Sequence, residues 1–301
     1  MVTTGLSFSK IRGARIAAVA LGTLLFVPQL ILAQTSSAPV ASQTSAVQLV
    51  RWMVQAELAA QTQDRTQWNY QEVKKTDGKQ EETRDVVETK DGTIDRLVAV
   101  AGRPLTPEQQ KKEDARIVKL SSDRDEIQKS EKAEESDAKN ERDLMKLLPV
   151  AFLYQDAGNE GGLKRITFCP NPNFHAPNRM AEVFHHMQGT MWIDGKRHRL
   201  ARLEGKIISE VKFGGGFLGH LDKGGTFTVR QAEVGPGHWD MVQLDIHMTG
   251  RALFFKTVNV REHELCSKYE RIPDDMTIQQ AAERLKKAPV VSSDASSTKP
   301  S

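Results

Sequence analysis

Four histidines form the densest group of potential metal ligands in the sequence: His175, His185, His186 and His198 fall within 24 residues. His185 and His186 are adjacent, so on a helix their side chains would point about 100° apart and could not share one ion without distortion. No HExxH motif is present. We therefore expect surface histidines, with no metal and no other cofactor. A metal-dependent hydrolase using His175, His185 and His198 is the least favoured hypothesis.

A glycine-rich segment, FGGGFLGHLDKGG from Phe213 to Gly225, has the composition of a phosphate-binding loop. It lacks a GKS or GKT ending and no helix is expected after it, so the helix terminus that binds phosphate is missing. Its apolar residues Phe217, Leu218 and Leu221 either cap the sheet or form an exposed tip, and capping is favoured. GxSxG is absent, Cys169 has no histidine partner that the sequence identifies, and the carboxylates concentrate in solvated helices. The sequence thus predicts no catalytic residues and no enzyme.

Aromatic residues in the expected strands are the candidate ligand-binding group. Side chains at alternating positions of a strand point to one face, so these rings either build an ordinary core or line a cavity for an apolar ligand. The ordinary core is favoured for any single ring. The candidate ligand-binding residues are Trp68, Tyr70, Trp192, Phe227, Trp239 and Phe254.

The first 33 residues have the three parts of a secretory signal peptide: a basic start, an apolar run from Ile16 to Val27, and a small residue, Ala33, at the cleavage point. The alternative is an uncleaved membrane anchor. Removing the leader removes three basic residues and no acidic ones, so the formal net charge of +3 falls to zero. We therefore expect a periplasmic or otherwise exported protein with no transmembrane segment after cleavage and no nucleic-acid partner.

Export would place Cys169 and Cys266 in an oxidising compartment, where a disulfide between them could persist. Both cysteines lie in strand-like stretches of the C-terminal half. Two unpaired thiols are an equally open alternative, because the sequence cannot test whether the two Cα atoms come within bonding reach.

The N-terminal half is expected to combine helices with a β-meander. Apolar residues at three- and four-residue intervals predict a helix from Val47 to Ala60. Thr106 and Gln109 flank a proline in the pattern of a helix N-terminus with a capping box, and the charged stretch 107–143 predicts one or two solvated helices rather than a coiled coil. Asp-Gly turns are expected to join three strands. These strands are Gln67–Lys75, Glu81–Lys90 and Ile94–Ala101.

The C-terminal half is expected to be strand after strand separated by tight turns, which indicates an antiparallel sheet. A short helix is expected from Arg179 to Gln188. With a strand around Ile166, about nine strands are expected in all. The strands expected in this half are Thr190–Asp194, Lys196–Glu210, Thr226–Val234, Trp239–Met248 and Arg251–Tyr269.

The predicted fold class is α+β, mainly antiparallel β, as a curved half-open β-barrel covered by helices. The leader at 1–33 precedes a disordered linker at 34–46. A single domain is expected at 47–287, with the charged helical insert at 107–143, and a disordered tail at 288–301.

The segment GTMWIDGKRHRLARLEGKI, from Gly189 to Ile207, resembles the strand–turn–strand step of the lipoprotein-carrier fold, the LolA/LolB-like proteins of outer-membrane lipoprotein sorting. The leader, the amphipathic first helix and the Asp-Gly meander fit the same resemblance. It implies a half-open antiparallel barrel with a helical lid that holds acyl chains. Phe213–Gly216, Lys223–Gly225 and Trp239 are also similar to a pattern in a family of uncharacterised exported proteins, which implies no activity.

The leading hypothesis is a non-catalytic periplasmic binding protein or carrier for an apolar ligand, either a lipid or a lipidated protein. Burial of an acyl chain contributes about 0.8 kcal/mol per methylene, so even one chain would bind. The alternative is an envelope structural or protein-interaction module, in which the charged helices at 107–143 dock an envelope protein partner.

Overall fold

The computed structural model describes residues 40–213, 219–252 and 256–287. The expected leader, the first part of the expected linker and the expected tail lie outside these residues. None of the described helices combines the length and the apolarity that a membrane span needs. The helices are α1 (Val40–Gln63), α2 (Pro107–Ser122), α3 (Arg124–Ala151), the short 3-10 helix η1 (Ala181–His186) and α4 (Ile278–Lys287).

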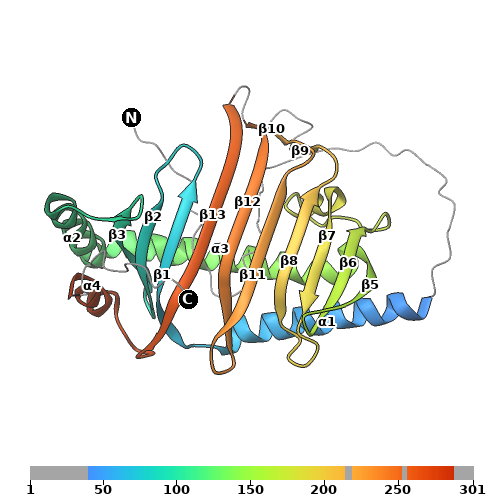
Figure 1. Ribbon diagram of the computed structural model, residues 1–301, viewed down its shortest axis with the longest axis horizontal. Coiled ribbons are helices and arrows are strands. Elements are labelled where there is room, and N and C mark those ends of the chain that lie inside the picture. The colour runs from blue at the N-terminus through green and yellow to red at the C-terminus, as the bar shows by residue number, and fades with distance from the viewer. Residues whose placement is uncertain (1–39, 214–218, 253–255, 288–301) are drawn as a thin grey trace, which may run out of the picture. The chain divides into compact units, whose positions relative to one another are not determined.

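The strands form one mainly antiparallel sheet of thirteen strands, which is not closed into a barrel (Figure 1). Its order is β4-β3-β2-β1-β13-β12-β11-β8-β7-β6-β5, and β10 pairs with both β12 and β9. This confirms the α+β class with antiparallel strands. The strands are β1 (Gln67–Thr76), β2 (Glu82–Thr89), β3 (Gly92–Val100), β4 (Arg103–Pro104), β5 (Phe152–Glu160), β6 (Leu163–Pro170), β7 (Met187–Ile193), β8 (Leu200–Ile207), β9 (Val211–Phe213), β10 (Gly219–Leu221), β11 (Thr226–Gly235), β12 (His238–Ala252) and β13 (Lys256–Ile272).

The described chain divides into two compact units, and neither is continuous in sequence. The first unit contains residues 65–135 and 264–287. The second contains residues 40–64, 136–213, 219–252 and 256–263. The expected single domain at 47–287 therefore corresponds to two units, and both α3 and β13 contribute residues to each.

In the first unit, α4 packs against β2 and β3, and α2 packs against β3 and α4. The buried face of α4 consists of Ile278, Ala281, Ala282 and Leu285, which recur at helical spacing. This face forms one apolar cluster with residues from β2, β3, α2 and the end of β13. The residues that it meets are Val87, Ile94, Ile117 and Ile272.

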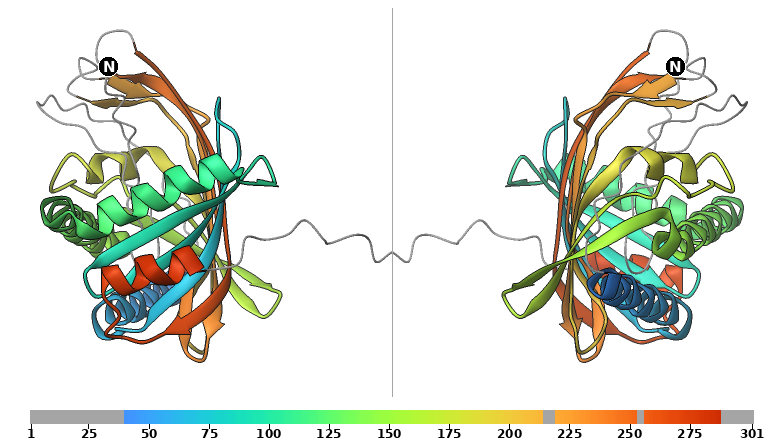
Figure 2. Two further views of the ribbon diagram at one scale, coloured as in Figure 1. Left: turned by 90° about the vertical axis from the view of Figure 1, so that its left-hand side faces the viewer. Right: turned by 90° about the vertical axis from the view of Figure 1, so that its right-hand side faces the viewer.

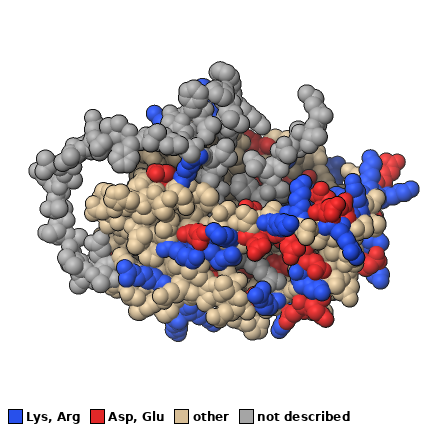
Figure 3. Space-filling view, turned by 180° about the vertical axis from the view of Figure 1, so that it is seen from behind, with Lys and Arg blue, Asp and Glu red and all other residues tan. Residues whose placement is uncertain are grey.

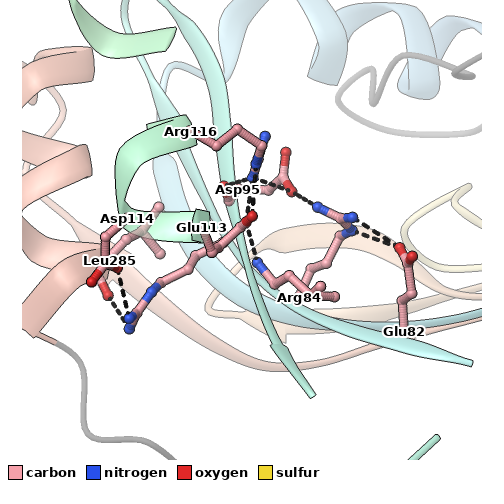
Figure 4. A network of polar contacts seen from close by, with 9 residues as sticks. Glu82, Arg84, Asp95, Glu113, Asp114, Arg116 and Leu285 are labelled. Carbon is pink, nitrogen blue, oxygen red and sulfur yellow. Dashed lines mark hydrogen bonds and ion pairs between the residues drawn. The ribbon is translucent and has the colours of Figure 1, made fainter. Parts of the chain in front are cut away.

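A polar network joins α2 and α4 to the same strands (Figure 4). Arg84 on β2 pairs with Asp95 on β3, and Asp95 also accepts from Arg116 of α2 at 3.3 Å. Burial alone would lower the pKa of Arg84, but the neighbouring Asp95 and Glu82 raise it instead. Arg96, which is 5% exposed, donates to the Leu285 carbonyl of α4 at 3.0 Å. Since these arginines all have partners, the network ties the helices to the strands.

Two local predictions are confirmed in this unit. Thr106 caps α2, because its hydroxyl accepts from the Gln109 N–H while the Gln109 side chain accepts from the Thr106 N–H. The meander turns at the two Asp-Gly sites, where Gly78 and Gly92 have φ of 71° and 114°. These values favour glycine, which lacks the Cβ that makes a positive φ costly.

In the second unit, α1 packs on β5 and lies along one face of the strands (Figure 2). Its predicted stripe is buried at Val50 and Val54, while Val47 and Leu58 are half-buried. The helix begins at Val40, so the residues from there to Ala46 are helical and the expected disordered linker is wrong for this stretch.

The charged stretch 107–143 forms parts of two helices, α2 and α3, and α3 continues into the apolar residues that follow it. Leu144, Met145 and Leu148 are buried on α3, so its C-terminal part belongs to the core rather than to the surface. The last turn ends at Ala151, and Asn171 donates to the Val150 and Ala151 carbonyls. Tyr154 donates to the Leu148 carbonyl at 2.6 Å, and burial raises the pKa of its hydroxyl.

The expected short helix before β7 is a single 3-10 segment, Ala181–His186, rather than a helix from Arg179 to Gln188. Strand β7 begins directly after it, at Met187. Phe184 is buried in this segment, and from Met187 the backbone pairs with β8 instead of continuing the helical turn.

Candidate functional site

The turn between β7 and β8 presents the side chains of His198 and Arg199 to α1. Asp194 closes this turn by accepting hydrogen bonds from the backbone N–H groups of Arg197 and Lys196, both at 2.8 Å, and these bonds lower the pKa of its carboxyl. His198 donates its N–H to the Asp194 carbonyl at 2.8 Å and has φ of 55°. A positive φ is uncommon for a residue other than glycine, and here it lies directly before Arg199.

Arg199 forms a buried ion pair with Glu57 of α1. Arg199 Nε lies 3.0 Å from Glu57 Oε1, and Nη2 lies 3.0 Å from Oε2. Glu57 Oε1 also accepts from the Leu200 N–H at 2.9 Å. The two residues are 1% and 8% exposed, so the pair is shielded from water and fixes α1 against the start of β8.

Two further contacts hold the same helix. The Trp52 ring, 45% exposed on α1, lies 5.1 Å from the His198 ring. Beyond the C-terminus of α1, the Asp64 carboxylate is hydrogen-bonded to Nδ1 of His238 on β12, whose Nε2 lies 3.8 Å from Asp240 Oδ2. Burial alone would lower the pKa of His238, but the neighbouring carboxylates of Asp240 and Asp64 outweigh burial and raise it. We call the contacts Glu57–Arg199, Trp52–His198 and Asp64–His238 the α1 clamp.

Beneath α1 lies a seam lined only by apolar side chains. The remaining space has a volume of about 20 Å³, close to that of one water molecule, so side chains fill the seam. The Phe152 ring meets Phe168 and Phe184 at centroid distances of 4.9 and 5.2 Å in edge-to-face packing. We call this region the apolar seam; its residues are Met53, Leu148, Phe152, Phe168, Phe184, Met187, Met191, Leu200, Leu203 and Phe227.

The opposite face of the same strands carries a groove of about 1010 Å³ that crosses β5, β6, β7, β8 and β11. Its side chains alternate along each strand with those of the apolar seam, which places the two on opposite faces. Eight of its ten alternating side chains carry hydroxyl, amide or charged groups. We call this region the outer groove; the residues whose side chains alternate with the seam are Leu153, Gln155, Thr167, Cys169, Gln188, Thr190, Glu204, Lys206, Thr226 and Thr228.

The structure distributes the predicted ligand-binding aromatics over both units. Trp68 and Tyr70 lie on β1 of the first unit and are 4% and 5% exposed. The Tyr70 ring stacks on Tyr269 at 4.9 Å, and Trp68 meets the same ring edge-on at 6.3 Å. These rings pack against one another in the core of the first unit.

Three of the predicted aromatics lie in the second unit, in different surroundings. Phe227 lines the apolar seam. Trp192 is covered by the Arg202 guanidinium, 4.3 Å from its ring centre, and donates from Nε1 to Glu160 at 3.0 Å. Trp239 is half-buried, with Arg199 5.9 Å from its ring centre. Phe254 lies outside the described residues.

The four histidines that cluster in the sequence have separate partners. His175 Nδ1 lies 3.1 Å from the Asn173 carbonyl, and His186 Nδ1 lies 2.8 Å from Ser209 Oγ. The His185 ring lies 5.4 Å from Phe174. Within residues 40–213, 219–252 and 256–287, no three His, Cys, Asp or Glu side chains are grouped so that they could hold a metal ion.

Cys169 is exposed on β6 and Cys266 is buried on β13, and both are free thiols in the structure. In the glycine-rich segment, Leu221 is buried on β10. Phe217 and Leu218 lie outside the described residues.

Sequence reasoning missed the polar residues of the α1 clamp. Glu57 and Arg199 are 142 positions apart, so no local spacing links them. The available signal was a single acidic residue within the apolar part of a helix, which is unusual unless the charge is paired. Comparison with protein-family models, curated proteins and solved structures found no match.

Proposed function

We propose that this chain is a non-catalytic, exported binding protein that carries an apolar ligand, a lipid or the acyl chain of a lipidated protein, between α1 and the strands of the second unit. The observation that carries the proposal is the apolar seam, whose lining contains no polar side chain. In this proposal the sheet acts as a curved half-open barrel with α1 as its lid, as the resemblance to lipoprotein carriers implies.

The seam is filled, so ligand entry requires α1 to move. Three of the lining residues are methionines, Met53, Met187 and Met191, whose unbranched side chains repack at low energetic cost. The α1 clamp consists of three contacts, all made by the second half of α1 and the residue that follows it, and Trp52 is already half-exposed. An acyl chain that replaced the buried face of α1 would regain the burial lost when the helix lifts.

The alternative function, docking of an envelope protein by the charged helices, receives less support. Charges of both signs lie next to one another in Figure 3, so no face of a single sign marks a docking surface in that view. On α3, Asp143 is paired with Lys139 at 2.8 Å and Lys146 at 3.0 Å, and these bonds lower its pKa to about 2. Such exposed helical pairs are typical of solvated helices.

A reversible lock on the lid tests the proposal. Trp52→Cys and His198→Cys, combined in a Cys169→Ser background, replace the two neighbouring rings by thiols that can be oxidised to a disulfide. We expect the oxidised protein to lose uptake of a fluorescent fatty acid and to regain it on reduction. The single variant Trp52→Cys is the control and should take up the probe under both conditions.

Native mass spectrometry of the gently purified full chain is a second test of the carrier proposal. A lipid adduct is expected. A clean unliganded mass together with no uptake of the fluorescent fatty acid would overturn the carrier function. Equal uptake by the locked and reduced forms would overturn entry beneath α1.

A further inference from the structure

The outer groove contains a row of polar side chains that runs across the strands rather than along them. The strand registers place Gln155 opposite Thr167, Thr167 opposite Thr190, Thr190 opposite Glu204, and Glu204 opposite Thr228. With adjacent strands about 4.8 Å apart, such a row spans roughly 19 Å. This length suits an extended ligand that lies across the strands.

Hydroxyl groups in this row are available for a ligand. Thr167 donates to the Gln155 carbonyl at 3.4 Å, whereas the hydroxyls of Thr190 and Thr228 have no hydrogen-bond partner among the described residues. A threonine hydroxyl both donates and accepts, which matches the hydroxyl groups of a sugar.

A second row, two residues further along the strands, is cationic. It places Arg165 opposite Trp192, Trp192 opposite Arg202, and Arg202 opposite Arg230. Arg165 and Arg202 have acidic neighbours: Arg165 lies 3.9 Å from Glu160, and Arg202 Nε lies 2.8 Å from Glu204. These pairs compensate the charges of Glu160 and Glu204.

Two cations of this face remain without such a neighbour. Arg230 and Lys206 are exposed, and neither lies within ion-pair distance of an acidic side chain in the part of the chain that the structure describes. Lys206 lines the outer groove itself, and its partner in the register is Thr226. The face therefore offers positive charge on both sides of the hydroxyl row.

We propose that the outer groove binds an extended acidic polysaccharide whose carboxylates meet Lys206 and Arg230 and whose hydroxyls meet Thr190 and Thr228. A peptide fits less well, because β7, β8 and β11 are each paired on both edges and offer no backbone for strand addition. A lipid surface also fits less well, because Leu153 is the one large apolar side chain that this groove exposes among the described residues. This site is independent of the apolar seam.

Titration of the purified full chain with oligogalacturonate tests the proposal, with dextran oligosaccharides of equal length as the neutral comparison. We expect binding of the acidic oligosaccharide and at least tenfold weaker binding of dextran. Arg230→Gln and Lys206→Gln should each weaken binding by about threefold to tenfold, as loss of one partly exposed charge contact would. The pair Thr190→Val with Thr228→Val should weaken it by at least threefold at unchanged charge.

Lys129→Gln on α3 is the matched control, since it removes one exposed cation outside the groove and should leave the affinity unchanged. The proposal is overturned if the wild type does not bind, if Lys129→Gln weakens binding as much as Arg230→Gln, or if polyglutamate, which has no hydroxyls, binds the wild type as tightly as oligogalacturonate does. Uptake of the fluorescent fatty acid, measured on the same variants, should not change. Loss of that uptake in the groove variants would overturn the independence of the two sites. Absence of uptake by the wild type would contradict the carrier function and not this site.

Discussion

Glu57 and Arg199 form a buried, bidentate ion pair that joins α1 to the β7–β8 turn, with both nitrogen–oxygen distances at 3.0 Å. Removing only one partner leaves the other charge buried without compensation. We expect Glu57→Gln to lower the free energy of unfolding by roughly 3–5 kcal/mol, measured by urea denaturation.

Replacing both residues, as Glu57→Met with Arg199→Met, should cost less than Glu57→Gln alone, because no buried charge then remains. Arg271→Gln is the control, since its pair with Asp274 at 3.2 Å is exposed and should contribute less than about 1 kcal/mol. Equal effects at the buried and the exposed pair would contradict the role of Glu57.

The stability contributed by His238 should depend on pH. Its pKa is raised by Asp240 and Asp64, so its charged form is favoured in the folded state. The contribution is fully present below the unfolded pKa of about 6.5 and is lost as the pH rises through the folded pKa. The difference in free energy of unfolding between the wild type and His238→Gln should therefore be larger at pH 5.5 than at pH 8.5. The exposed His175→Gln is the comparison, and a difference for His238→Gln that did not change with pH would count against the clamp.

Gly205 should not tolerate a side chain. A Cβ at this position would lie 2.2 Å from the Phe227 ring, which covers the glycine in the core of the sheet. We expect Gly205→Ala to lower the free energy of unfolding by about 1–3 kcal/mol, as overpacking does. Gly195→Ala is the matched control, because its Cβ would meet the Lys164 side chain at an ordinary 3.5 Å. Similar melting temperatures for the two variants would refute this packing argument.

The cap of α2 should have a measurable effect on stability. Thr106→Ala removes the hydroxyl that accepts from the Gln109 N–H and should lower the free energy of unfolding by about 1 kcal/mol. Thr106→Ser keeps this hydroxyl and should restore most of the loss. A serine variant as unstable as the alanine variant would show that the methyl group, not the cap, is responsible.

The two cysteines should react at different rates. Cys169 is exposed and Cys266 is buried, so iodoacetamide should label Cys169 in the native protein and Cys266 only after unfolding. Peptide mass spectrometry distinguishes the two sites. A disulfide would instead protect both cysteines until reduction.

Elements with strong local signals could be predicted from the sequence. The meander β1–β3 follows from its Asp-Gly turns and α2 from its capping box, because these features depend on residues a few positions apart. Strand β5 was missed because α3 passes into it directly after Ala151, with no turn residues between them, and Pro149 lies inside the last turn of the helix rather than after it. The short strands β4, β9 and β10 offer too few residues for a periodic pattern.

The candidate site was harder to predict, because it depends on contacts between distant segments. Phe227 was correctly placed among apolar residues of a strand, but its neighbours in the seam come from α1, α3, η1 and four other strands. Trp68 and Tyr70 looked equivalent to it in sequence, yet they belong to the other unit. Strand alternation identifies which residues share a face, and it cannot identify which segments meet there.

The apolar cluster of the first unit has a consequence for the folding rate. Val87, Ile94 and Ile117 pack against Ile272, Ile278 and Leu285, so two segments separated by the whole middle of the chain must meet before this core is complete. Contacts of such long sequence separation slow folding and prolong the lifetime of states with uncovered apolar surface. The chain should therefore refold slowly, with a yield that falls as protein concentration rises and recovers when a chaperone shields those surfaces.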